Sequence, residues 1–200
     1  MNAAAPAAIS LVGDAYDVEG YGLLPRVSRI IRAVMPFIPR AQLEAGAERG
    51  TKVHEACEFI DAGFDADVDP SVRGYADAYK RFLAETGFTI VKSEYKVANP
   101  PAKYAGTIDR VGTWQGDTCI LDIKSGQVGP DMQMQLAAYA YAYWLMESGD
   151  ATVRLPKCML LQLFDDGTYK VHEFKQTEIE AAFQAFLGLA KYARWKEHLT

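Results

Sequence analysis

The sequence predicts a mixed α/β domain, an α+β arrangement in which helices flank a mixed sheet. Three observations favour this fold class: helical spacing of apolar residues up to residue 86, alternation from residue 88, and helix again on both sides of a later hairpin. Half of the 200 residues are apolar and 24% are charged, which is enough apolar surface for one core without disulfides. We expect a loose arm over residues 1–20 and a single domain over residues 21–200.

Three helices are expected before the sheet. Residues 23–40 are basic and apolar, and prolines bracket a short helix over residues 28–34. Residues 41–62 and 71–86 carry apolar side chains at helical spacing, and the acidic, turn-rich segment between them predicts a linker.

The sheet begins where the periodicity changes. In FTIVKSEYKVA (88–98), apolar and polar residues alternate, which predicts a strand with Lys92, Glu94 and Lys96 on its polar face. The remaining elements are strands over 103–114 and 117–126, a helix over 131–147, a hairpin over 157–174 and an amphipathic helix over 177–198.

Charge, cysteine spacing and hydrophobicity argue against several classes of protein. The net charge of −5 argues against a protein that binds nucleic acid with its whole surface, although it leaves room for a local basic groove. Three widely spaced cysteines match neither a zinc site nor a disulfide framework and fit a reducing cytoplasm. The segment MNAAAPAAIS lacks the basic region and apolar core of a signal peptide, and no apolar run approaches a membrane span. We expect a cytoplasmic protein with no membrane partner.

Two aspartates face each other in the predicted hairpin. If Gln115-Gly116 is a two-residue turn, Thr113 pairs with Thr118 and, further along, Asp109 pairs with Asp122. Directly opposed side chains have Cβ atoms about 4.5–5.5 Å apart, so two like charges there repel. A divalent cation between them reverses that repulsion, and Mg²⁺ prefers a few carboxylate oxygens with positions left for water and phosphate.

Lys124 shares a strand face with Asp122, because side chains at i and i+2 point the same way. Near a phosphate that is being cleaved, its ammonium group can stabilise developing negative charge or position water. The alternative is a lysine that only forms a salt bridge with the aspartate.

Two helices carry further candidate residues. One face of helix 41–62 is apolar and small, which predicts close packing against it: Leu43, Ala47, Gly50, His54 and Cys57. His54, in the middle of that face, is either a core histidine or a metal ligand. Gln135 and Tyr139 are neighbours on helix 131–147 and either hold a phosphate, brace the strand that carries the site, or pack without a role in it.

Four short segments occur in the order of a known family. GTKVH (50–54), GTIDRVG (106–112), LDIKSG (121–126) and QLAAY (135–139) together resemble the RecB-like exonuclease branch of the PD-(D/E)XK nuclease superfamily. Each motif is weak alone, and the specific signal is their order downstream of a histidine. The resemblance implies a restriction-endonuclease-like PD-(D/E)XK core with flanking helices and with both aspartates on the central hairpin.

The resemblance also implies roles for the matching residues. His54, Asp109 and Asp122 would bind a catalytic Mg²⁺ or Mn²⁺, with the backbone carbonyl of Ile123 as a further ligand. Lys124 would act with the two aspartates in catalysis. No iron–sulfur cluster is expected, because the chain lacks the cysteine set that some relatives carry.

Four further residues have supporting roles in this interpretation. Gln135 and Tyr139 would support the site or contact DNA. Glu94 would assist the metal site or bind a second metal, or it faces solvent between two lysines. Arg29 lies in a short basic segment similar to the helix that opens such nucleases, and it would contact a phosphate unless that helix face is only solvated.

We therefore expect a metal-dependent DNA nuclease that hydrolyses phosphodiester bonds, more specifically an exonuclease in recombination, repair or phage DNA processing. Its partners would be DNA with free ends and a separate recombinase, helicase or single-strand-binding protein, in a bacterial or phage-infected cell. One alternative is a catalytically silent or partner-activated nuclease-fold module that binds DNA ends or a protein. Another is an enzyme that uses Lys124 in Schiff-base chemistry, which is disfavoured because two carboxylates keep a lysine protonated.

Overall fold

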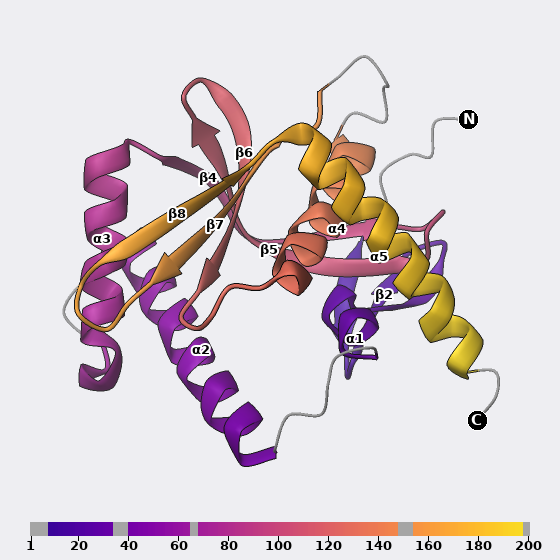
Figure 1. The fold of residues 1–200 in the computed structure, drawn as a ribbon, viewed down its shortest axis with the longest axis horizontal. Helices are drawn as coiled ribbons and strands as arrows, with labels where there is room; N and C mark the ends of the chain where they lie inside the picture. Colours follow the sequence, from indigo (N-terminus) through magenta and orange to yellow (C-terminus); the bar gives the residue numbers. More distant parts are fainter. Residues whose placement is uncertain (1–7, 34–39, 65–67, 148–153, 198–200) are drawn as a thin grey trace.

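A computed structural model describes residues 8–33, 40–64, 68–147 and 154–197. Its centre is a five-stranded mixed sheet in the order β4-β5-β6-β7-β8 (Figure 1). The strands are β4 (Thr89–Asn99), β5 (Tyr104–Trp114), β6 (Asp117–Lys124), β7 (Lys157–Leu163) and β8 (Tyr169–Phe174). Neighbouring strands are antiparallel except β6 and β7, which are parallel and are joined through a helix, as a parallel pair requires.

The hairpin register predicted from the sequence is confirmed. Gln115 and Gly116 have φ angles of 50° and 85°, the left-handed geometry of a two-residue hairpin turn, and Thr113 pairs with Thr118. The paired positions continue to Arg110 and Leu121. Asp109 and Asp122 are the next positions of the same register.

Helices cover both faces of the sheet. On one face, α2 (Arg40–Asp61), a 3₁₀ turn η1 (Pro70–Val72) and α3 (Arg73–Thr86) enclose a core that contains Phe82, Leu121 and Ile123. On the other face, α4 (Pro130–Glu147) and α5 (Gln176–Glu197) enclose a second core with Val111 and Ile120. The predicted mixed α/β fold is therefore confirmed (Figure 1). None of the helices among the described residues has an apolar stretch long enough to cross a membrane.

The N-terminal segment differs from the prediction. Short strands β1 (Ile9–Val12), β2 (Ala15–Val18) and β3 (Gly22–Pro25) form a separate sheet, followed by α1 (Val27–Arg32). Tyr16 and Val18 are buried, and the Tyr16 hydroxyl lies 2.7 Å from the Thr107 hydroxyl on β5. The expectation of a loose arm is therefore wrong for residues 9–18, because tertiary contacts order them, while residues 1–7 lie outside the described residues. That residues 21–200 form a single domain stays a prediction.

Among the side chains that the structure describes, which do not include Leu43, the close packing expected along the small face of α2 holds only near its C-terminal end. Val53 and Cys57 are buried. Ala47 is exposed, and a methyl group built on Gly50 would meet no atom within 4 Å. The start of α2 lies away from the sheet (Figure 1). His54 therefore sits where the helix leaves the core, with its side chain 29% exposed.

Candidate active site

The two aspartates of the hairpin lie side by side at the buried centre of the sheet. Asp109 is on β5 and Asp122 on β6, and both are buried. The backbone N–H of Ile123 donates a hydrogen bond of 2.6 Å to Oδ2 of Asp109. This bond fixes the Asp109 carboxylate against β6, beside the residue that follows Asp122.

Lys124 forms an ion pair with Asp122, with Nζ 2.7 Å from Oδ2. Burial raises the pKa of Asp122, the charge of Asp109 adds to the effect, and Lys124 opposes it, for a value of about 6. Burial acts to lower the pKa of Lys124, but the attraction of Asp122 and Asp109 outweighs it and raises that pKa. The lysine is therefore a cation at neutral pH, which does not suit a Schiff-base nucleophile.

A second group of ligand-type side chains meets at Asp109. His54 on α2, Glu94 on β4 and Asp109 have candidate ligand atoms within 4.8 Å of one another. His54 Nδ1 lies 3.8 Å from Oδ2 of Asp109. Burial, followed by the charges of Asp109 and Glu58, raises the pKa of Glu94. An imidazole and two carboxylates that disfavour each other's charge form a donor set suited to a divalent cation.

Glu94 reaches this group through an irregular backbone. The register of β4 and β5 pairs Ser93 with Arg110 and Tyr95 with Ile108, so Glu94 stands opposite Asp109. Glu94 has a φ of 48°, a left-handed conformation that costs a non-glycine residue on the order of 1 kcal/mol or more.

The uniform polar face predicted for this strand is wrong, because the positive φ of Glu94 breaks the regular alternation between Lys92 and Glu94. As a result, Lys92 lies over the Tyr95 ring at 3.9 Å and pairs with Glu147, apart from Glu94. The Glu94 side chain therefore lies beside His54 and Asp109, whereas the Lys92 side chain contacts Glu147 of α4.

Gln135 and Tyr139 lie together on α4, and Gln135 Nε2 donates to the Tyr139 hydroxyl at 2.9 Å. The Tyr139 ring packs against Gly106 so closely that a methyl group there would approach Cε1 to 2.4 Å. Burial raises the pKa of Tyr139, and the nearby charge of Asp122 adds to it. The tyrosine therefore occupies the space beside β5 and close to the aspartates, and the role of the Gln135–Tyr139 pair stays a prediction.

Arg29 lies in a different part of the molecule. It lines a hollow of about 220 Å³ between α1 and α5, together with Arg194 and Lys196. None of the other predicted site residues lines this hollow. Its cationic lining suits an anion, and a phosphate contact by Arg29 stays a prediction.

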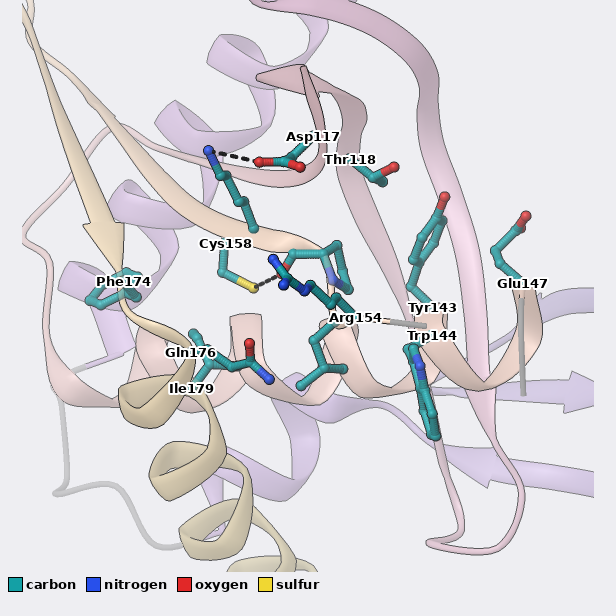
Figure 2. Close-up of a pocket in the computed structure, with 13 residues that line it drawn as sticks. Asp117, Thr118, Tyr143, Trp144, Glu147, Arg154, Cys158, Phe174, Gln176 and Ile179 are labelled. Atoms are coloured by element: carbon teal, nitrogen blue, oxygen red, sulfur yellow. Dashed lines mark hydrogen bonds and ion pairs between the residues drawn. The ribbon is translucent and has the colours of Figure 1, made fainter. Parts of the chain in front are cut away.

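A larger hollow of about 640 Å³ lies at the opposite end of β6 (Figure 2). Asp117 and Thr118, at the start of β6, line one side, and Gln176 and Ile179 of α5 line another. None of the predicted site residues borders it. The chemistry-bearing residues thus gather at the C-terminal end of β6, away from this hollow.

Three residues beside the site were not anticipated: Asp61, Tyr79 and Arg110. Arg110 is fully buried and forms an ion pair with Asp61. Tyr79 donates a hydrogen bond of 2.8 Å to the same aspartate. A signal was present in the sequence, because an arginine next to Asp109 in a central strand must find a buried acid on the opposite face.

The chain is similar to a known protein family. A family model described as the PD-(D/E)XK nuclease superfamily matches residues 40–198. No curated protein matches the chain.

Among solved structures, an alkaline exonuclease (LHK-Exo) from Laribacter hongkongensis is 15% identical, with a TM-score of 0.41 over 86% of this chain and 92% of that one. LHK-Exo in complex with dAMP is 16% identical, with a TM-score of 0.41 over 88% of this chain and 93% of that one. SSO0001 is 12% identical, with a TM-score of 0.31 over 82% of this chain and 84% of that one. These likenesses are distant.

Proposed function

Because the chain belongs to the PD-(D/E)XK nuclease superfamily, we propose that it is a DNA nuclease that depends on Mg²⁺ or Mn²⁺ and removes nucleotides from free ends. One observation carries this proposal: Asp109, Asp122 and Lys124 meet at the end of a buried hairpin, with His54 and Glu94 against the first aspartate. The proposal extends to DNA recombination, repair or phage DNA processing in the cytoplasm, with a recombinase, helicase or single-strand-binding protein as a separate partner.

The donor set fits a hard divalent cation. Asp109 is common to both groups, because it lies next to Asp122 in the hairpin and within reach of His54 and Glu94. We assign the metal to His54, Asp109 and Asp122, with the Ile123 carbonyl and Glu94 as further ligands. When bound, such a cation polarises the phosphoryl group and lowers the pKa of water.

Lys124 contributes the fixed positive charge of the site. Its ammonium group is largely buried and is held by Asp122 at 2.7 Å, so it is oriented before substrate binds. A charge positioned in this way stabilises the negative charge that develops on phosphate oxygens during hydrolysis. Asp122 keeps the lysine protonated and in place. In this proposal Lys124, Asp109 and Asp122 are the catalytic residues.

Gln135 and Tyr139 of α4 and the hollow lined by Arg29 have supporting roles in the proposal. Tyr139 and Gln135 brace the strand that carries Asp109, because the Tyr139 ring rests on Gly106 of β5. Arg29, with Arg194, contacts a phosphate of the DNA strand away from the cleaved bond.

The rival function is a silent or partner-activated module that binds DNA ends or a protein. A silent nuclease fold no longer needs its charged groups, yet Asp109, Asp122 and Lys124 are all present and in contact with one another or with the hairpin. The burial of these charges costs stability, which favours a site that performs chemistry.

The test is release of labelled nucleotide from end-labelled linear DNA, single- and double-stranded, with Mg²⁺ or Mn²⁺. A closed circle in parallel separates cleavage at ends from internal cleavage. We expect release from linear DNA that Asp122→Ala and Lys124→Ala abolish. The matched control is Asp117→Ala, at an exposed acid on the same strand, which should leave release unchanged. Metal-independent release, or release that survives both site substitutions, would contradict the proposal, and a folded wild type that binds DNA without cutting it would favour the rival.

A further inference from the structure

One guanidinium group contacts all three elements that supply the group at Asp109. Arg110 Nε pairs with Asp61 of α2, the helix that carries His54. Its Nη1 donates to the backbone carbonyl of Asp109 at 2.6 Å and lies 3.4 Å from Oε1 of Glu94 on β4. The planar fork of an arginine can hold several acceptors at fixed angles, which a lysine cannot.

The Arg110 side chain is locked in one orientation. It is fully buried, so its charge needs acidic partners inside the protein. Asp61 provides the main one, and the Tyr79 hydroxyl fixes Asp61 by a hydrogen bond of 2.8 Å to the other carboxylate oxygen. Burial acts to lower the pKa of Arg110, but the neighbouring Tyr79 and Asp61 outweigh it, so the group stays charged.

We propose that Arg110, oriented by Asp61 and Tyr79, is a positioning residue that sets the distances between His54, Glu94 and Asp109. The inference rests on the proposed function, because it concerns the same metal site. The reason lies in which groups the Arg110 guanidinium contacts. The Asp61 carboxylate already neutralises the charge of Arg110, and the further contacts go to the Glu94 carboxylate and the main chain of Asp109, which both belong to the group around Asp109.

The geometry predicts how a conservative substitution acts. Arg110→Lys keeps the positive charge near Asp61 but cannot contact α2, β4 and β5 together. Glu94, already held at a positive φ, would then lose the contact of its carboxylate with Arg110. Partners that orient metal ligands typically alter metal affinity by 10–100-fold when they are changed, so we expect a loss of about tenfold.

The first measurement is Mn²⁺ binding to the metal-free protein by isothermal titration calorimetry, at a temperature well below the unfolding midpoint. Arg110→Lys should raise the Kd for Mn²⁺ by about tenfold while it still unfolds cooperatively. Tyr79→Phe, which leaves Arg110 in place and frees one oxygen of Asp61, should shift the Kd in the same direction by a smaller factor. Arg81→Lys is the control, since Arg81 forms an exposed ion pair with Glu85 on α3, and its Kd should equal that of the wild type.

A double-mutant comparison separates positioning from a general structural effect. If Arg110 acts through Glu94, the loss in Glu94→Gln combined with Arg110→Lys should be close to the loss in Glu94→Gln alone. A folded Arg110→Lys protein with wild-type Mn²⁺ affinity, or fully additive losses, would overturn the inference. If Arg110→Lys does not fold, Tyr79→Phe carries the test, and wild-type affinity there would overturn it.

Failure of the proposed function gives a different result. A wild type that binds Mn²⁺ but cuts no DNA would refute the nuclease while the titrations still decide the role of Arg110. A wild type that binds no Mn²⁺ would refute both.

Discussion

Replacing Asp122 by asparagine should make the metal-free protein more stable while it removes cleavage. Asp122 is 2% exposed, and its carboxylate lies next to Asp109. Asparagine has nearly the same shape and carries no charge, so Asp122→Asn removes a buried negative charge without leaving a cavity. Natural active sites store instability of this kind, and its relief on substitution is a signature of function.

The magnitude follows from the pKa of Asp122. Burial holds that pKa at about 6, against an ordinary value of 3.8. At about 1.4 kcal/mol for each pKa unit, the ionised carboxylate costs the fold about 3 kcal/mol at pH 8. This figure already includes the attraction of Lys124. For a chain of this size it corresponds to a rise of about 6–12 °C in the unfolding midpoint of Asp122→Asn.

The pH dependence has a definite sign. The folded-state pKa lies above the unfolded value, so the wild type takes up a proton on folding between pH 3.8 and about 6. Its destabilisation by Asp122 is complete above pH 6 and disappears as the pH falls towards 4. The stability difference between Asp122→Asn and the wild type should therefore be largest at pH 8 and close to zero near pH 4.

The assay is thermal and urea unfolding in EDTA, at several pH values, with Asp117→Asn as the control. Asp117 is exposed and pairs with Lys157, so its neutralisation should change stability by less than about 1 kcal/mol. Added Mn²⁺ should stabilise the wild type more than Asp122→Asn. A variant that is no more stable than the wild type at pH 8 without metal would refute the reasoning that the aspartates form a strained site.

Four further substitutions test the same structure. Lys124→Met should reduce DNA cleavage by about 10²-fold or more and retain Mn²⁺ binding by calorimetry, because the ammonium acts on the phosphate and not on the metal. Gly74→Ala should destabilise the protein by about 1–3 kcal/mol in urea unfolding, because its methyl group would lie 1.7 Å from the carbonyl oxygen of Asp165. By contrast, Gly188→Ala meets no atom and should stabilise α5 by up to about 1 kcal/mol. Gly106→Ala should displace the Tyr139 ring and lower cleavage at saturating Mn²⁺, and unchanged cleavage would argue against the bracing role.

Most of the fold after residue 40 could be predicted from the sequence, because it depends on local patterns. The period of apolar residues changes from helical to alternating near residue 87, and the strands begin there. The hairpin register followed from one turn, since Gln115 and Gly116 fix which residues pair. Once that register is known, the proximity of Asp109 and Asp122 needs no other information.

The features that could not be predicted depend on contacts between distant segments. The N-terminal sheet consists of four-residue strands, which are too short to show a clear periodicity in the sequence. These strands are held in place by the contact of Tyr16 with β5. The position of Glu94 depends on its positive φ, which strict alternation does not include. The partners of Arg110 come from α2 and α3, and no local pattern indicates which buried acid an arginine will meet.

The residues of the site come from distant positions in the sequence, and this affects when activity can arise as the chain folds. His54, Glu94, Asp109 and Asp122 belong to four elements, and Arg110 joins three of those elements through contacts that span up to 49 residues. Long-range contacts of this kind form late, after local helices and hairpins. A partly folded or truncated chain would therefore contain the hairpin with both aspartates and still lack His54 and Glu94 beside them. Under the proposed function, DNA cleavage would begin only when folding brings His54 and Glu94 to the two aspartates.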